Sequence, residues 1–505
     1  MSITCRNKRL RALPKNLETP LGPMPASPIA PSSVQAPRLP STKHDKNLRA
    51  LSDAFDTFDI KDGSVLSFHH HYRNGDRLMN AVLDVAANRG LKGLTIAPSS
   101  LFPVHAPLVT HIQSGVITGV VTDYAKGPVA DAMMSGTLQT PPLLQSHGGR
   151  ARALASGLLS VDVAFIGASL ATSDGACTGR GGAVPCGPLG YAQVDAAYAR
   201  HSVVCAHEIV EHPLPHIDIP AEHIDAVIPF ANPGDVGGIA SDTTLPAQTP
   251  QAQNIGRLVA EVITAAGLLQ NGMSLQTGAG GYSLAAVPFI GQALRIANLR
   301  GSFLSGGITG AHVALQQEGL FDRIHDVQCF DGAAVASSIS NPNHYAMSAS
   351  EYANPLHSAP IVDQLSVMVL GAVEIDQHFN VNVTIAGDGR LIGGPGGHPD
   401  AAQGANLTIV TTGLTGAGYP KLVKDVRCVT TPGTDIDVLV NDHGIAVNPA
   451  RTDLLAKLTN AGLPIVGFDT LREMAELQAV HTPSPVSPFP RLLIEHREGG
   501  LLDWA

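Results

Sequence analysis

Histidine, arginine and glycine residues collect where apolar stretches of this chain end, and these residue types are suited to bind a ligand. In the first half, Ser64–Phe68 and Leu143–Ser146 are both predicted to be β-strands. The turns after them carry imidazole and guanidinium groups, namely His69, His70, His71 and Arg73 after the first, and His147, Gly148, Gly149 and Arg150 after the second. Ligands of open α/β sheets lie at the carboxyl ends of the strands, so these turns are candidates for binding an anion.

The three consecutive histidines allow more than one interpretation. On extended backbone successive side chains alternate sides, so either His70 alone or His69 together with His71 faces a given ligand. A metal site built from these histidines and Asp76 is an alternative. Their spacing matches no familiar ligand pattern, and carboxylates at ligand spacing are missing, so we predict no metal site.

The stretch Leu275–Thr309 carries two glycine-rich turns. It is predicted to form a strand, a turn with Gly278, Gly280 and Gly281, a helix from about 283 to 299, and a strand at 302–304 that ends in Ser305-Gly306-Gly307. Glycine lets a ligand approach backbone N–H groups closely, and a helix N-terminus favours negative charge. Both turns could be simple tight connections, but two of them at the ends of neighbouring strands favour a ligand site. A dinucleotide site is disfavoured, because the loop fits GxGxxG loosely and residues 295–303 contain no acidic side chain.

Strand-like and helix-like stretches alternate along the chain, which predicts an α/β fold. Residues 1–44 are rich in Pro, Ser, Arg and Lys and are predicted to be a disordered or extended tail. A segment rich in Gly, Pro, Asp and Thr near residue 240 separates an N-terminal domain, 45–240, from a C-terminal domain, 241–485. Residues 486–505 are expected to be a C-terminal extension.

Composition narrows the function further. The formal net charge of −10 argues against nucleic acid as a partner, because neutralising phosphates requires a basic face. The six cysteines form no CxxC pair, which is typical of reduced thiols in a cytosolic protein. No apolar run has the length of a membrane span, and no apolar segment follows the basic N-terminus. We therefore expect a cytoplasmic protein.

Eight motifs, taken together and in order, resemble the alpha subunit of bacterial citrate lyase, a member of the CoA-transferase superfamily. They are SFHHHYRNGD (67–76), SHGGR (146–150), LGYAQVDA (189–196), LQTGAGG (275–281), LSGGIT (304–309), EIDQHFNVNV (374–383), GGPGGH (393–398) and VNDHGIAVNPAR (440–451). The resemblance implies two Rossmann-like open-sheet CoA-transferase domains with the site between them. Asp442 and His443 are candidates for substrate binding because they too follow a predicted strand, and the quoted motifs also contain the candidates His398, Asn380 and Asn382.

The resemblance also implies a reaction and partners. In this family an acetyl thioester on an acyl-carrier (gamma) subunit reacts with citrate to give a citryl thioester and acetate. A lyase (beta) subunit then cleaves the citryl thioester. The thiol belongs to the carrier's phosphoribosyl-dephospho-CoA group, so no cofactor is expected on this chain.

Glutamate-dependent CoA-transferases place a nucleophilic Glu after the glycine loop, at the end of the next strand. The corresponding window here, 300–309, contains no carboxylate. We therefore expect citrate to attack the acetyl thioester directly through a mixed anhydride, with backbone N–H groups of Gly280, Gly281, Gly306 and Gly307 stabilising the oxyanion. Arg73 or Arg150, with His69 or His71, are the candidate cations for citrate. Glu374 is the rival nucleophile, although a structural role is favoured. The segment 374–382 is predicted to be extended, so that Asn380 and Asn382 share a face with Glu374.

Two other functions share the fold. A transferase that uses free CoA and a small carboxylate could employ Glu374 as its nucleophile. A chain without the usual nucleophilic Glu could also be a non-catalytic, ligand-binding or scaffold subunit. Gly-rich loops in both halves argue against the non-catalytic role.

Overall fold

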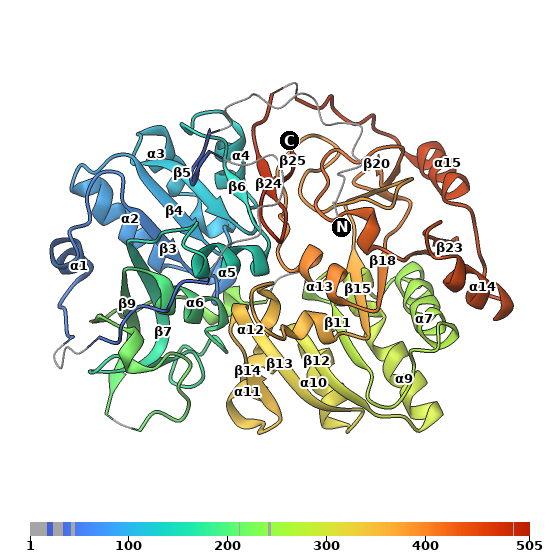
Figure 1. Ribbon diagram of the computed structural model, residues 1–505, viewed down its shortest axis with the longest axis horizontal. Helices are drawn as coiled ribbons and strands as arrows, with labels where there is room; N and C mark the ends of the chain where they lie inside the picture. Colours follow the sequence, from blue (N-terminus) through green and yellow to red (C-terminus); the bar gives the residue numbers. More distant parts are fainter. Residues whose placement is uncertain (1–17, 24–33, 42–45, 212, 241–243, 488) are drawn as a thin grey trace.

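The computed structural model describes residues 18–23, 34–41, 46–211, 213–240, 244–487 and 489–505, and its elements form two large sheets flanked by helices (Figure 1). The predicted α/β fold with open, mostly parallel sheets is confirmed. Most of the tail predicted at 1–44 lies outside the described residues; its residues 34–41 are extended and run along the first sheet's helices, where Gln35 N–H donates to Ala155 O at 2.8 Å. Within the described residues, no helix combines the length and apolarity needed to span a bilayer.

The first sheet has ten strands in the order β10-β9-β7-β3-β4-β5-β6-β24-β25, with β8 beside β7. Its strands are β3 (Val65–Phe68), β4 (Leu94–Pro98), β5 (Ile117–Thr122), β6 (Leu143–Leu144), β7 (Val163–Thr172), β8 (Cys177–Thr178), β9 (His201–Val210), β10 (Ala226–Pro229), β24 (Leu493–Glu495) and β25 (Leu501–Trp504). The helices of this half are α1 (Leu51–Thr57), α2 (Leu78–Asn88), α3 (Leu108–Gln113), α4 (Pro128–Met134), α5 (His147–Ala155) and α6 (Gly190–Tyr198). Strand β7 is buried along nearly its whole length and is mostly apolar, as expected for a central strand of a parallel sheet that is covered on both faces.

The second sheet has eight strands in the order β14-β13-β12-β11-β15-β18-β22-β23. They are β11 (Ser274–Thr277), β12 (Gly301–Ile308), β13 (Phe321–Cys329), β14 (His344–Ala346), β15 (Val367–Gly371), β18 (Leu407–Thr411), β22 (Val438–Asn441) and β23 (Gly444–Val447). The helices are α7 (Pro250–Ala265), α8 (Gly281–Ala285), α9 (Val287–Ala297), α10 (Gly310–Gln317), α11 (Gly332–Ser340), α12 (Ala349–Ala353), α13 (His398–Gly404), α14 (Thr452–Asn460) and α15 (Phe468–Gln478). The same half of the chain contains a small three-stranded sheet, made of β17 (Val381–Asn382), β16 (Glu374–Asp376) and β21 (Leu422–Val423). There are also two short hairpins, β1 (Glu18–Thr19) with β2 (Gly22–Pro23) and β19 (Thr415–Gly416) with β20 (Tyr419–Pro420).

Each sheet reverses its strand order once. In the first sheet, β3 has β4 on one side and β7 on the other, and the chain continues outward in both directions. In the second, β11 lies between β12 and β15 in the same way. A reversal of this kind opens a crevice at the carboxyl ends of the central strands, where open α/β proteins bind ligands. The histidine turn follows β3, and the Gly278–Gly281 turn follows β11.

The two halves share one interior. Helices α5, α6 and α12 contact one another and lie between the two sheets in Figure 1. One buried cluster joins Ile166 of β7 to Leu304 of β12, and a second joins Ala97 of β4 to Met368 of β15. The halves therefore pack as one body through apolar side chains.

The chain enters the second half between β10 and α7 and returns to the first half at its end. Residues 486–505, expected as an extension, include β24, which pairs in parallel with β6 so that Leu493 faces Leu143. At the end of this strand, Glu495 accepts a hydrogen bond from Gln145 at 2.7 Å and forms an ion pair with the buried Arg152 at 2.8 Å. The last strands thus complete the first sheet.

Three local predictions were wrong. Strand β12 does not end before Gly306 but continues to Ile308, because a bulge at Gly306/Gly307 absorbs the irregularity and pairing with β13 resumes. The predicted helix at 283–299 is two helices, since Pro288, in the first turn of α9, has no N–H to continue the hydrogen bonding of α8. The segment 374–382 is a hairpin turning at Phe379, whose φ is 63°, rather than one extended stretch.

Candidate active site

The turn after β3 joins the two halves of the molecule. The backbone carbonyl of His70 accepts hydrogen bonds from Arg73 N–H at 2.9 Å and from Gln328 Nε2 at 2.7 Å. Gln328 belongs to β13 of the second sheet, so the turn is held from both sides. This places the side chains of His70 and Arg73 at the interface between the halves.

Arg73 is a buried cation whose partner is missing. Its guanidinium lies between the rings of Phe102, at 5.3 Å, and Phe330, at 4.6 Å, and 8% of the residue is exposed. It forms no ion pair with any described residue, and its Nε is buried without a hydrogen-bond partner. Its φ of 54° is strained for a residue with a side chain, which is typical of functional positions. Burial lowers the pKa of Arg73 to about 10, so the group stays charged at neutral pH and attracts an anion.

His70 faces a cluster of rings at the interface between the halves, formed by Phe102, His147 and Tyr191, rather than the histidines next to it in sequence. Its Nδ1 lies 2.6 Å from Ser99 Oγ, and its ring lies 4.7 Å from the ring of Tyr191, with the two planes tilted by 31°. Burial, with His147 and Arg73 close by, lowers the pKa of His70 well below its ordinary value, so the ring is neutral. The hydroxyls of Tyr191 and Tyr124 form no hydrogen bond with described residues, so polar groups at this interface are left for a ligand.

His147 pairs with a carboxylate that sequence reasoning had not singled out. Its Nδ1 lies 2.8 Å from Asp123 Oδ2, and its ring is 4.7 Å from Tyr191 and 6.1 Å from His70. Burial raises the pKa of Asp123 to about 6 against the opposing effect of His147. Asp123 follows β5, so the rule that placed the other candidates at strand ends would also have found it.

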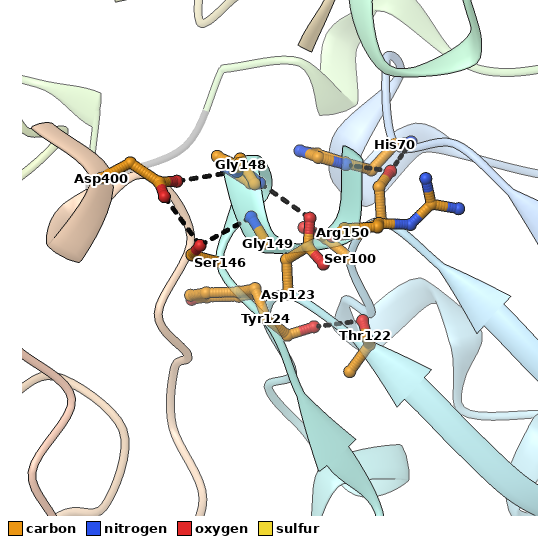
Figure 2. Close-up of polar contacts among 12 residues, drawn as sticks. His70, Ser100, Thr122, Asp123, Tyr124, Ser146, Gly148, Gly149, Arg150 and Asp400 are labelled. Carbon is orange, nitrogen blue, oxygen red and sulfur yellow. Dashed lines mark hydrogen bonds and ion pairs between the residues drawn. The ribbon is translucent and has the colours of Figure 1, made fainter. Parts of the chain in front are cut away.

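Gly148 and Gly149 use their N–H groups within the protein. Ser146 caps α5 by accepting from Gly149 N–H at 2.9 Å, and Asp400 of the second half accepts from Gly148 N–H at 2.9 Å and from Ser146 Oγ at 2.7 Å. Figure 2 shows Asp400 and His70 on opposite sides of Gly148. The start of α5 is therefore capped from the other half, and these two N–H groups are not free to bind substrate.

Arg150 and His69 also have partners inside the protein. Arg150 binds Asp195 through two hydrogen bonds of 2.6 and 2.8 Å, and His69 Nε2 lies 3.0 Å from the same carboxylate. Burial opposes the charge on Asp195, but Arg150 and His69 outweigh it and hold the pKa of this carboxyl below its usual range. His71 stacks on His69 at 5.9 Å, and its Nε2 is buried without a partner. Of the two candidate cations, only Arg73 lacks a carboxylate.

The glycines of the second half lie in two different places. Gly278 N–H donates to Val369 O at 2.8 Å, and Gly280 is exposed at the start of α8. Gly306 and Gly307 lie at the bulge of β12, where φ of Gly306 is +97° and a Cβ on Gly307 would come within 2.2 Å of the Phe330 ring. Because Phe330 also stacks on Arg73, Gly307 lies beside the interface cluster.

Glu374 is held as a structural carboxylate. Its Oε2 accepts from Asn382 Nδ2 and from Arg427 N–H, both at 2.9 Å, and 2% of the residue is exposed. Asn380, across the hairpin, donates to Asp376 at 3.1 Å and accepts from Gly433 N–H at 2.9 Å. The expectation that Asn380 and Asn382 share a face with Glu374 was therefore wrong for Asn380, because the chain turns between them.

The remaining candidates, His398, Asp442 and His443, have partners other than the residues around Arg73. Both ring nitrogens of His398 are used, by Thr431 at 2.7 Å and by Gly371 O at 3.0 Å, and burial lowers its pKa to about 4. Asp442 accepts from Gln251 at 2.9 Å, and Gln251 in turn binds Tyr282 of α8, so Asp442 lies near the Gly280 turn. His443 is 43% exposed.

Among the described residues, one group could hold a metal ion. The donor atoms of Asp326, Cys329 and His344 lie within 4.8 Å of one another and are buried. Their polar atoms satisfy one another, with Cys329 Sγ and His344 Nε2 each 3.0 Å from Asp326 Oδ2 and Ser337 Oγ on the other His344 nitrogen. The geometry therefore fits a closed hydrogen-bonded triad without an ion.

Sequence reasoning missed the residues that complete the cluster, namely Ser99, Phe102, Asp123, Tyr124, Tyr191 and Phe330. Ser99 and Asp123 follow β4 and β5 directly, so their position was a usable signal. Tyr191 stands in a quoted motif, but its side chain reaches the cluster only through the packing of α6 between the sheets.

Comparison with known proteins places the chain in a family. The model of the family "citrate lyase, alpha subunit" matches residues 44–505. The citrate lyase alpha chain of Escherichia coli is 39% identical over 501 residues, covering 99% of this chain and 97% of its own, and that of Klebsiella pneumoniae is 38% identical over 483 residues, covering 94% and 95%.

Solved structures agree with this placement. A crystal structure from Streptococcus mutans, described as an alpha subunit of citrate lyase in complex with citrate, superposes with a TM-score of 0.90 at 38% identity, covering 94% of this chain and 93% of that one. A Pseudomonas malonate decarboxylase shares the fold alone, with a TM-score of 0.63 at 16% identity over 86% of this chain and 88% of that one. The chain belongs to the citrate lyase alpha subunit family.

Proposed function

We propose that this chain exchanges the acetyl group of an acyl-carrier thioester for citrate, giving a citryl thioester and acetate. The observation that carries the proposal is Arg73, a buried guanidinium with no carboxylate partner among the described residues, at the strand reversal of the first sheet. A buried charge of this kind is costly unless a ligand neutralises it. Citrate, as a tricarboxylate, supplies that neutralising charge and leaves a further carboxylate to react.

The reaction runs between the two substrates without an acyl-enzyme. Strand β12 carries no carboxylate from Ser305 to Ile308, and Glu374 is held by Asn382 and the backbone of Arg427. A citrate carboxylate oxygen attacks the acetyl carbonyl carbon, and the C–S bond breaks with its electron pair on sulfur. The thiolate then attacks the citryl carbonyl of the mixed anhydride, and acetate leaves. The protein holds both acyl groups in place and stabilises each oxyanion.

The thiol arrives on a partner. The family resemblance supplies a carrier (gamma) subunit with a CoA-like prosthetic group, and a lyase (beta) subunit that consumes the citryl thioester. This chain then needs no cofactor of its own. Its role is to bring the carrier's thioester and citrate together at the interface between the halves.

The test mixes the purified chain with acetyl-carrier protein and ¹⁴C-citrate in the absence of any lyase subunit. We expect one acetate released for each labelled citryl group that appears on the carrier. A matched reaction with acetyl-CoA in place of the carrier identifies a free-CoA transferase, which would be faster with CoA. Trapping of a covalent acyl group on Glu374 by hydroxylamine would overturn the direct-exchange mechanism, and no acetate release with either donor would leave a binding or scaffold subunit.

A further inference from the structure

We infer that His70 is a catalytic residue of this exchange, and that its Nε2–H donates a hydrogen bond to the oxyanion that forms at the thioester carbonyl. The inference rests on the proposed function. It replaces a backbone donor with a side chain whose proton position the surrounding residues determine.

The proton position follows from Ser99. Ser99 Oγ lies 3.2 Å from His70 N–H, from which it accepts, and 2.6 Å from His70 Nδ1. Since the oxygen already accepts the backbone proton and its own hydroxyl proton has no other acceptor among the described residues, that proton points to Nδ1. Nδ1 is then the acceptor, and the ring proton is on Nε2.

The ring nitrogen that carries the proton is free of protein partners. Nε2 makes no hydrogen bond with a described residue. It is not fully buried, unlike Nε2 of His71, which also lacks a hydrogen-bond partner. The ring of Tyr191 packs against the His70 ring at 4.7 Å, and the rings of Phe102 and His147 lie 6.0 and 6.1 Å away. These neighbours fix the direction in which Nε2–H points.

His70 and Arg73 serve the same ligand position. The two residues lie at the ends of one turn, closed by the hydrogen bond from Arg73 N–H to His70 O, and both side chains contact Phe102. When one citrate carboxylate is bound to Arg73, the thioester carbonyl that citrate attacks lies on the side of His70. Burial and the adjacent His147 and Arg73 keep the pKa of His70 low, so the donor is a neutral imidazole that does not pair with the ground-state carboxylates.

The chemical role is electrostatic and moves no proton. As the citrate oxygen attacks the acetyl carbonyl, the π electrons of C=O move onto oxygen, and Nε2–H stabilises that charge. When the C–S bond breaks, the electrons return and the charge leaves on sulfur. The same donor acts again when the thiolate attacks the citryl carbonyl. Because the hydrogen bond strengthens only in the transition state, its loss lowers kcat more than it raises KM.

Two substitutions that differ in donor position test the role. His70→Gln places an amide N–H near the position of Nε2, whereas His70→Asn places one near Nδ1. We expect His70→Asn to lower kcat by about 10²- to 10³-fold with KM for citrate nearly unchanged, and His70→Gln to recover part of that loss. His207→Asn is the control, since the His207 ring contacts only the backbone of Ala231 outside the cluster.

A spectroscopic readout checks the tautomer independently of rate. In ¹⁵N-histidine-labelled protein at pH 7, the signal that disappears in His70→Gln should belong to a neutral ring protonated at Nε2, and Ser99→Ala should allow the other tautomer to appear. A ring protonated at Nδ1 or at both nitrogens would overturn the inference. Equal losses in His70→Asn and His70→Gln, or a loss confined to KM, would overturn it too. If the wild-type chain releases no acetate while the tautomer is as described, the proposed function fails rather than the assignment of the proton.

Discussion

Arg73 illustrates how a buried charge can weaken the fold to which it belongs. The charge is buried between Phe102 and Phe330, and no described carboxylate balances it. Replacing it with a neutral side chain of similar length removes that cost, so Arg73→Met should raise the melting temperature while abolishing exchange. Both effects follow from one property, a buried positive charge that no described carboxylate neutralises.

Arg73→Lys tests the planar donor geometry separately from the charge. A lysine keeps the positive charge but loses the two parallel hydrogen bonds to a carboxylate, so KM for citrate should rise by about 10- to 10²-fold. Initial rates of acetate release at varied citrate measure this. Arg77→Lys is the control, because Arg77 is 53% exposed and lies 3.9 Å from Asp235. An unchanged KM in Arg73→Lys would assign citrate binding to another residue.

Glu374→Gln separates a structural carboxylate from a nucleophile. One oxygen accepts from both Asn382 and Arg427 N–H, and the other lies 3.4 Å from Arg427 Nε. An amide oxygen can keep the first two contacts, but its NH2 group then faces the Arg427 guanidinium and the ion pair is lost. We expect the free energy of unfolding to fall by about 1–3 kcal/mol while kcat stays within a few-fold of the wild type. Urea unfolding and the exchange assay measure the two quantities. A loss of exchange of several orders of magnitude in a folded protein would make Glu374 the nucleophile.

Asp123 makes stability depend on pH in a predictable direction. Its pKa in the folded protein is about 6, above the ordinary value of 3.8, so the folded state binds more protons between these values. Stability contributed by this group is therefore greatest at low pH and falls as pH rises through about 6. Asp123→Asn should remove this part of the profile, so that the variant gains melting temperature relative to the wild type on going from pH 4.5 to pH 7. A difference that does not change with pH would contradict the raised pKa.

At the scale of single residues, the sequence marked the turn that contains Arg73 as a candidate but did not reveal which residues pair with one another. The position of Arg73 after a predicted strand marked it as a candidate, and the structure adds that it is unpaired. Arg150 looked equivalent, and its pairing with Asp195 depends on how α5 and α6 pack. Such pairing is set by tertiary contacts, which residue type and spacing do not encode.

At the scale of elements, the pairing of β24 with the first sheet could not be predicted from short stretches of sequence. Its three residues carry no strong strand pattern, and its partner β6 precedes it by hundreds of positions, as the separation of 350 residues between Gln145 and Glu495 shows. A continuous apolar run, such as the one that begins β7, indicates a buried strand in the sequence itself. The pattern of apolar residues misjudged β12, where a bulge at two glycines looks like the end of a strand.

Removing residues 491–505 tests what the returning strands do. Without them β6 becomes an unprotected sheet edge, and the buried Arg152 loses its ion pair with Glu495. An unpaired buried charge costs about 3–5 kcal/mol, and open edges favour aggregation. We expect a sharply lower melting temperature and aggregates in size-exclusion chromatography. Truncation at 499, which spares β24, is the milder control; equal stability of all three proteins would show that β24 is dispensable.

At the scale of the whole molecule, the two halves are tied together across the start of α5. Asp400 accepts from Gly148 N–H and Ser146 Oγ, and Gln328 donates to His70 O. The sequence predicted two α/β halves from alternation and glycine turns. It could not predict that the halves share buried clusters, because contact between distant surfaces leaves no local pattern.

Asp400→Ala measures this connection. The substitution leaves Gly148 N–H and Ser146 Oγ without their partner, so the free energy of unfolding should fall by about 1–3 kcal/mol for each orphaned group. Exchange activity should fall as well, because the same loop carries His147. Asp453→Ala, at a side chain that is 60% exposed, is the control. A single, unshifted unfolding transition in Asp400→Ala would show that the halves are held by apolar packing alone.

The return of β24 to the first sheet also sets an order for how the protein comes off the ribosome. The strands of the first sheet emerge early, yet β6 must wait for a partner about 350 residues later. At translation rates of about 5–20 residues per second, that delay is roughly 20–70 seconds. Through that time the nascent chain presents an open sheet edge, which is a natural position for a chaperone to protect. The candidate active site also forms late, because Gln328, which holds the turn of His70, follows it by 258 residues.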